Sequence, residues 1–178
     1  MRSSPFVRAL RVALALSVVA CAREPRRVTA RAADDFGDTL SAGAAPRRIV
    51  SLNPSTTEIL FAIGAGNRLV GRTTYDLWPA AARAVPDLGP GLRPNVEAVL
   101  AVHPDLVILY ASDDNRDAAR RLRAAGVPTA AFRVDRIAEF ERVTRALGTL
   151  TGDSSAARAT VDSVRATIAR VRAATAPS

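Results

Sequence analysis

Short apolar runs alternate along the chain with stretches that have a helical pattern. Residues 49–52 and 106–110 are almost wholly apolar, which is typical of buried parallel strands. Weaker runs at 69–71 and 129–134 predict two more strands, and Val85–Leu88 is a further candidate. Strands that alternate with helices predict a parallel sheet covered on both faces, which is a Rossmann-like α/β lobe.

Turn and capping residues set the expected helix boundaries. Pro54 ends the first strand, and Ser55-Thr-Thr-Glu58 fits a capping box in which Ser55 is the N-cap and Glu58 the third helical residue. Asn95 is expected to cap a helix that ends at Ala101. Later helices are expected over residues 117–125, which Gly126 ends, and after the N-cap Asp135.

The end of the chain has a different pattern. Apolar residues recur there at alternating four- and three-residue steps, while arginines lie off this stripe. We therefore expect one long amphipathic helix over residues 153–175, whose apolar stripe consists of Ala157, Val161, Val164, Ile168 and Val171.

The first residues have the pattern of an export signal. Arginines without acids precede the short apolar run Val12–Ala20, which is shorter than the roughly 20 residues that a spanning helix needs. Val18-Val19-Ala20-Cys21 matches the box in which a bacterial lipoprotein carries lipid on its cysteine; the alternative is an incidental cysteine in an ordinary signal peptide. Residues 1–21 are thus expected to be a lipoprotein signal peptide ending at the lipidated Cys21. Residues 22–47 are expected to be a flexible linker, and residues 48–152 the folded lobe.

Charge and composition narrow the function. The 178 residues carry a formal net charge of +8, and every Lys or Arg position is an arginine, a charge balance that also occurs in nucleic-acid-binding proteins. These arginines are scattered among alanines and only 4% of residues are aromatic, which favours solvated helix faces and no nucleic-acid partner.

Catalytic and metal-binding chemistry lack candidates. The single histidine, His103, precedes Pro104-Asp105 in an expected turn, so it supports neither a catalytic triad nor a site for bare metal ions. The chain has no Gly-Lys-Ser/Thr phosphate loop. We expect no enzyme, no metal site and no cofactor; Asp76 is the one carboxylate worth testing for catalysis.

Three segments together resemble a known family: RIVSLNPSTTEILFAIGAGNRLVGRTTYD, VPDLGPGLRPNVEAVLAVHPDLVILY and LRAAGVPTAAFRV. They look like the N-terminal lobe of the helical-backbone (class III) periplasmic substrate-binding proteins of ABC importers, of the vitamin B12, iron-siderophore and haem type. The resemblance implies two α/β lobes joined by a long rigid helix. It further implies that this sequence contains one lobe and that helix, with the second lobe absent.

The expected ligand site lies where the strands end, because open α/β sheets bind ligands beyond their carboxyl edges. The first helix begins there and points free N–H groups outward. Aromatic residues at this rim would suit a large planar ligand, and the resemblance implies ligand contact for the positions of Tyr75 and Tyr110, and more weakly for Pro90 and Trp78; the alternative for each is packing beneath a loop. The expected ligand-binding residues are Pro54, Ser55, Tyr75, Asp76, Trp78, Pro90 and Tyr110.

Glu97 is assigned separately. An acid in the first turn of a helix is favoured by the helix dipole alone. The resemblance implies that Glu97 docks onto arginines of a membrane permease.

Taken together, the sequence predicts a lipid-anchored, extracytoplasmic substrate-binding protein that captures cobalamin, haem or a ferric siderophore. Its partners would be the permease and ATPase subunits of an ABC importer. The alternative is a surface-tethered interaction module without transport function. Because a missing lobe would leave the last helix partly uncovered, the chain is also expected to self-associate or to be only marginally stable.

Overall fold

Four parallel strands form the centre of the lobe, in the order β4-β3-β5-β6. The structure is a computed structural model that describes residues 31–41 and 44–175. The strands are β3 (Ile49–Leu52), β4 (Leu69–Gly71), β5 (Leu106–Tyr110) and β6 (Thr129–Phe132). The parallel α/β lobe predicted from the sequence is confirmed, and the Val85–Leu88 candidate reduces to an isolated bridge between Arg72 and Asp87.

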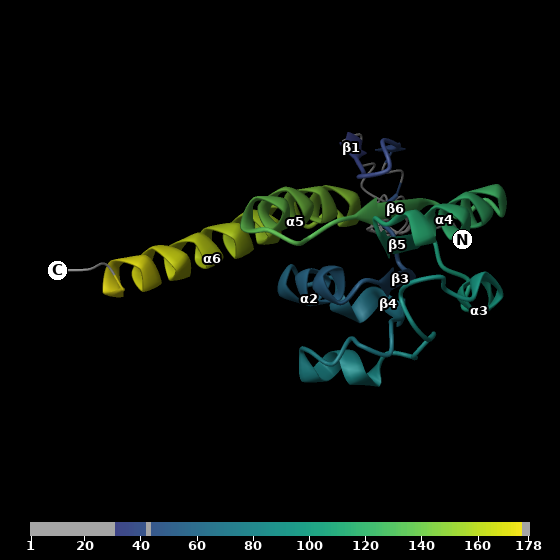
Figure 1. Ribbon diagram of the computed structural model, residues 1–178, viewed down its shortest axis with the longest axis horizontal. Coiled ribbons are helices and arrows are strands. Elements are labelled where there is room, and N and C mark those ends of the chain that lie inside the picture. The colour runs from purple at the N-terminus through teal and green to yellow at the C-terminus, as the bar shows by residue number, and fades with distance from the viewer. Residues whose placement is uncertain (1–30, 42–43, 176–178) are drawn as a thin grey trace, which may run out of the picture.

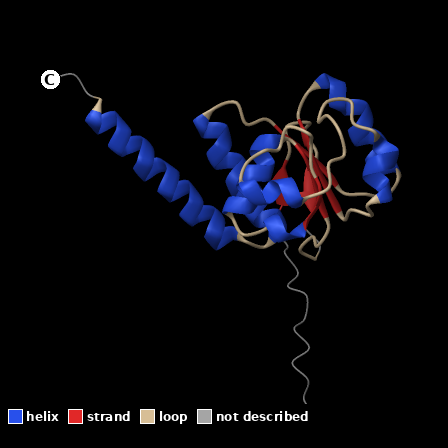
Figure 2. Ribbon diagram, turned by 90° about the horizontal axis from the view of Figure 1, so that it is seen from below, coloured by secondary structure: helices blue, strands red, loops and turns tan. Residues whose placement is uncertain are grey.

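Helices cover both faces of this sheet (Figure 2). Along β5, Leu106 and Ile108 face a core shared with α2, α5 and α6, while Val107 and Leu109 face a core shared with α3 and α4. This alternation explains the unbroken apolar run of β5, because a strand buried on both faces needs apolar side chains at every position. The helices are α2 (Pro54–Ala62), α3 (Val96–Ala101), α4 (Asp113–Ala124), α5 (Ile137–Thr151) and α6 (Ser154–Ala174), with single 3-10 turns η1 (Gly66–Arg68) and η2 (Ala80–Ala84).

The start of α2 differs from the prediction. Asn53, not Ser55, is the N-cap, and its side-chain oxygen accepts a hydrogen bond from the Ser55 N–H (3.1 Å). Pro54 then occupies the first helical position, where its fixed φ and missing N–H are no disadvantage. The predicted capping box at Ser55 and Glu58 is therefore wrong, because Asn is as good a cap as Ser and stands before the proline.

Two other boundaries also shift. Helix α4 begins at Asp113 rather than residue 117, with Ser112 as its N-cap. The N-cap of α5 is Arg136 rather than Asp135, and the Glu139 carboxylate accepts hydrogen bonds from both backbone N–H groups (2.7 and 3.0 Å).

Part of the predicted linker is folded. The sequence predicts a flexible segment over residues 22–47, but residues 31–41 form an antiparallel hairpin of β1 (Arg31–Ala33) and β2 (Thr39–Ser41). Figure 1 shows this hairpin beside the edge of the main sheet.

The hairpin turn binds the free edge of β6. The Asp35 N–H donates to the Ala131 carbonyl (2.8 Å), and the Ala131 N–H donates to the Asp34 carboxylate (3.1 Å). The buried Asp34 carboxylate also pairs with Arg123 (3.1 Å), and Asp35 pairs with Arg142 (2.8 Å). The linker prediction is wrong here because these acidic residues, which look solvated in the sequence, are paired with arginines of the lobe and cover an exposed strand edge.

The long C-terminal helix is present. The first half of α6 packs on α5, where Ala157 and Val161 are buried; a Cβ added at Gly148 would lie 2.4 Å from that of Ala157, so only glycine allows this approach. Farther along, α6 projects away from the lobe (Figure 1), and Val171 is 57% exposed. None of the helices within the described residues combines the length and apolar character needed to cross a bilayer.

Candidate functional site

The loops that follow β3 and β4 meet Tyr110, the last residue of β5, at the carboxyl edge of the sheet, where they line a recess of about 310 Å³. Hereafter "the recess" means the hollow lined by Leu52, Asn53, Pro54, Thr73, Tyr75, Pro90, Gly91, Leu92 and Tyr110. β3 and β5 are adjacent and in parallel register, but α2 leaves β3 toward one face of the sheet and α4 leaves β5 toward the other. Such a reversal opens a crevice between neighbouring strand ends, which is where open α/β sheets bind ligands.

Four of the seven predicted ligand-binding residues line the recess: Pro54, Tyr75, Pro90 and Tyr110. Tyr75 is 67% exposed, so its ring is available to a ligand. The sequence thus predicted that these four residues lie together at the carboxyl edge of the sheet, and they do. The other three predicted residues, Ser55, Asp76 and Trp78, lie elsewhere.

Asp76 lies inside the protein and is 1% exposed. Its carboxylate accepts hydrogen bonds from the hydroxyls of Thr57 on α2 and Thr73 in the loop after β4, both at 2.5 Å. The Thr73 hydroxyl in turn accepts from the Tyr75 N–H (3.1 Å). The prediction that Asp76 faces a ligand is wrong; its carboxylate ties the loop that carries Tyr75 to α2.

Tyr110 is held at its phenol end. The hydroxyl donates to both carboxylate oxygens of Asp135 (3.2 and 3.0 Å). Burial, followed by this hydrogen bond and the negative charge of Asp135, raises the pKa of Tyr110 above its ordinary value. The phenol therefore stays protonated at neutral pH and offers a neutral aromatic face to the recess.

Sequence reasoning missed Asn115, which lies behind the recess in the first turn of α4 and is fully buried. Its side chain bonds the backbone of both Gly91 and Tyr110. The signal available in the sequence was a polar residue of low helix propensity between a central strand and the helix expected from residue 117.

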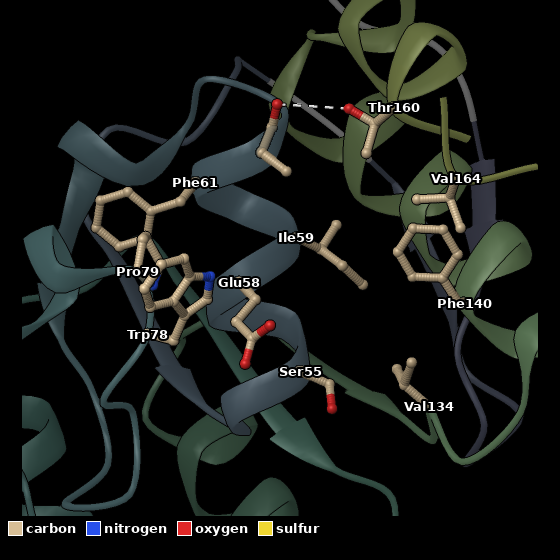
Figure 3. A pocket seen from close by; sticks show the side chains of 11 residues that line it. Ser55, Glu58, Ile59, Phe61, Trp78, Pro79, Val134, Phe140, Thr160 and Val164 are labelled. Atoms are coloured by element: carbon tan, nitrogen blue, oxygen red, sulfur yellow. Dashed lines mark hydrogen bonds between the residues drawn. The ribbon is translucent and has the colours of Figure 1, made fainter. Parts of the chain in front are cut away.

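Ser55 and Trp78 line a second and larger hollow of about 580 Å³ between α2, α5 and α6 (Figure 3). We call it the α2–α6 groove, lined by Ser55, Glu58, Ile59, Phe61, Ala62, Trp78, Pro79, Val134, Phe140, Thr160 and Val164. Figure 3 shows Trp78 beside Phe61 on one side and Phe140 and Val164 on the other. The turn after Asp76 takes Trp78 around α2, which is why it does not reach the recess.

Glu58 is the one charged side chain that lines the α2–α6 groove. Burial, and secondarily the negative charge of Asp76, raise the pKa of Glu58 above its ordinary value of 4.5. The groove is otherwise apolar apart from two hydroxyl groups, so it offers few directional contacts to a polar ligand.

Glu97 lies on the surface, in the first turn of α3, with 72% of its side chain exposed. It forms an ion pair with Arg121 of α4 (2.5 Å). Cys21, the predicted lipidation site, lies outside the described residues. Within the described residues, no group of three or more His, Cys, Asp or Glu side chains could hold a metal ion.

Residues 49–178 match the family model described as "Periplasmic binding protein". The uncharacterized ABC transporter substrate-binding lipoprotein YvrC of Bacillus subtilis is 42% identical over 84 residues, which cover 46% of this chain and 26% of that protein. The vitamin B12-binding protein of Yersinia pestis is 37% identical over 90 residues, 51% of this chain and 32% of that protein.

The fold is also that of solved structures. The periplasmic heme-binding protein RhuT from Roseiflexus sp. RS-1 superposes with a TM-score of 0.66 at 31% identity, covering 71% of this chain and 49% of that one. This chain thus spans about half the length of that structure, and its matched segments span a third or less of the two relatives.

Proposed function

The chain belongs to the periplasmic binding protein family, and from this premise we propose that it forms the ligand-binding lobe of an ABC-importer receptor. The proposed ligand is a large planar or chelated molecule: cobalamin, haem or a ferric siderophore. The names of similar proteins, which bind vitamin B12 or heme, support this ligand class.

One observation carries the proposal: the loops after β3 and β4 converge with the end of β5, which brings Tyr75 and Tyr110 to one recess. Aromatic faces with a few polar groups are the usual lining of sites for bulky organic ligands. The recess volume of about 310 Å³ is at the small end for such ligands, which fits one wall of a larger site.

Delivery to a permease is the second part of the proposal. Glu97, on α3, follows the rim residues Gly91 and Leu92 by six and five residues. One of its carboxylate oxygens pairs with Arg121. A charge at such a rim gives register and a faster encounter more than affinity. We propose that Glu97 exchanges Arg121 for a permease arginine, and that lipid on Cys21 holds the protein at the outer side of a membrane.

Ligand binding can be tested on residues 31–178, which contain every described element, and on a longer product if the reading frame continues. Cyanocobalamin, haemin and a ferric hydroxamate would be titrated by absorbance and calorimetry. We expect micromolar or tighter binding of one of them. If neither product binds any of the three ligands, the result would count decisively against the proposal.

A matched set of aromatic variants locates the site. Tyr75→Ala and Tyr110→Ala should weaken binding by roughly tenfold or more, because each removes a stacking surface. Trp78→Ala removes an equally exposed aromatic residue outside the recess and should leave the affinity within about twofold. If Trp78→Ala weakens binding more than Tyr75→Ala, the ligand occupies the α2–α6 groove instead.

A second function, a surface-tethered interaction module, is favoured by one feature, the uncovered α2–α6 groove with its exposed Trp78. A stable chain that binds no small ligand but binds a protein through this groove would support it.

A further inference from the structure

Asn115 connects two segments that line the recess: the loop of residues 89–93, which precedes it in the sequence by about twenty residues, and the end of β5, which directly precedes α4. Its side-chain nitrogen donates to the carbonyls of Gly91 and Tyr110, both at 3.0 Å, and its oxygen accepts from the Arg93 N–H, also at 3.0 Å. An asparagine amide has two N–H donors, so this arrangement uses both of them and an acceptor position. The side chain is 0% exposed and does not reach the recess surface.

The loop of residues 89–93 is confined on both sides. In front, a Cβ added at Gly91 would lie 2.4 Å from the Leu52 carbonyl oxygen, so the loop lies directly against the end of β3. Behind, Arg93 has a φ of +51°, which few non-glycine residues adopt without support. That support comes from the Asn115 oxygen and from the ion pair of Arg93 with Asp114 (2.6 Å).

We infer that Asn115 is a positioning residue that fixes the separation of loop 89–93 from the end of β5 before any ligand arrives. This inference rests on the proposed function in one respect, that the recess is where the ligand binds. A loop that is already ordered loses less conformational freedom on binding, so a fixed recess binds more tightly than a mobile one of equal contacts. Asn115 therefore contributes to affinity without touching the ligand.

Asn115→Asp tests this with almost no change in shape. The carboxylate still accepts from Arg93 but cannot donate, so the Gly91 and Tyr110 carbonyls both lose their donor. Asn95→Asp is the matched control, because the Asn95 side chain only accepts a hydrogen bond, from the Ala98 N–H (3.0 Å), and a carboxylate does the same. Val143→Ala, in the buried core on the other face of the sheet, controls for a general loss of stability.

Amide hydrogen exchange decides the inference without a ligand. The amide of Thr74 donates to the Gly89 carbonyl of the loop (3.1 Å), and the amide of Ser112 donates to the Tyr110 carbonyl (2.9 Å). In Asn115→Asp, both amides should exchange at least about tenfold faster than in a Val143→Ala protein compared at equal stability, because local opening adds to global unfolding. Asn95→Asp should match the wild type. Equal exchange at Thr74 and Ser112 in Asn115→Asp and Val143→Ala would overturn the inference.

Binding supplies the functional readout, with haemin, cyanocobalamin and a ferric hydroxamate as probes, each titrated well below the melting temperature of each variant. Asn115→Asp should weaken binding of the probe about tenfold, with a less favourable binding entropy, while Asn95→Asp and Val143→Ala stay near wild type. Faster exchange at the recess with unchanged affinity would overturn the positioning role. If the wild type binds none of the three probes, the proposed function is lost, and hydrogen exchange alone judges whether Asn115 fixes loop 89–93 and the end of β5.

Discussion

The recess and the α2–α6 groove both border α2, but they are built in opposite ways. The recess is the smaller, about 310 Å³ against about 580 Å³, and buried polar side chains behind it tie its loops together. The groove is lined mostly by apolar side chains and is bordered by α6, which projects beyond the lobe (Figures 1 and 3).

This difference shows that size alone does not identify a binding site. A hollow between loops that buried hydrogen bonds hold in place keeps its shape in water, and its few polar groups can orient a ligand. An apolar hollow beside an uncovered helix is instead a surface for association, because covering it with another protein surface lowers the free energy. Four predictions test this contrast, in order of decreasing effect.

Removing the carboxylate behind the recess should have the largest effect. Asp76→Ala leaves the buried hydroxyls of Thr57 and Thr73 without their acceptor, at a cost of about 2–4 kcal/mol in the free energy of unfolding. Asp76→Asn should cost less than half of that, because each hydroxyl can rotate to donate or accept. Urea unfolding measures both. A loss below about 1 kcal/mol for Asp76→Ala would mean that the loop after β4 does not depend on this carboxylate.

Adding one methyl group to the recess wall should come next. Gly91→Ala places a Cβ 2.4 Å from backbone oxygen of Leu52, so the loop must move, at a cost of about 1–3 kcal/mol. On the open groove wall, the larger change Ala62→Leu should alter unfolding free energy by no more than about 0.5 kcal/mol. Similar losses for the two variants would contradict the contrast between a fixed recess and an open groove.

The sequence predicted the features of the two hollows that neighbouring residues determine, and it missed those that depend on contacts between distant residues. The strands Ile49–Leu52 and Leu106–Tyr110 and the loops after them are set by local signals, namely an unbroken apolar run followed by turn or capping residues. Because parallel strands end at one edge, the meeting of Pro54, Tyr75 and Tyr110 followed from those signals. The long C-terminal helix was equally predictable, because its apolar residues recur with a helical period.

The features that the sequence did not predict are set by contacts between distant residues. Asn115 forms hydrogen bonds with Gly91 and Tyr110, and the residues next to it in the sequence do not indicate those partners. Asp76 and Trp78 stand two residues apart, yet the turn of the loop sends one into the interior and the other around α2. The hairpin at residues 31–41 has the composition of a linker, and it folds because Asp34 and Asp35 pair with arginines that lie 89 and 107 residues farther along the chain.

The uncovered stripe of α6 should make the chain self-associate, at a strength of about 1 kcal/mol or more per exposed apolar residue buried. Ile168→Asp should shift the protein toward monomer, since it places a charge in the stripe. Ala166→Asp adds the same charge on the opposite, exposed side of α6 and should leave association unchanged. Light scattering over a concentration series measures this. A wild-type protein that is a monodisperse monomer with a sharp melting transition would contradict it.

Charge in the groove should give the smallest effect, and its sign is fixed by the pKa of Glu58. Burial, then the charge of Asp76, raise that pKa above 4.5, so the folded protein holds this proton more tightly than the unfolded chain does. The resulting stability is fully present below pH 4.5 and is lost as the pH rises through the raised pKa.

Glu58→Gln removes the charge, so it should raise the melting temperature slightly at pH 7 and leave it unchanged near pH 4. The effect is small because solvent still reaches Glu58. Glu97→Gln is the matched control, for which we expect the opposite sign. Glu97 pairs with Arg121, so removing its charge should leave the melting temperature at pH 7 equal or slightly lower. A lower melting temperature for Glu58→Gln at pH 7 would mean that the charge of Glu58 is already compensated, and the groove would then be a less apolar environment than its lining indicates.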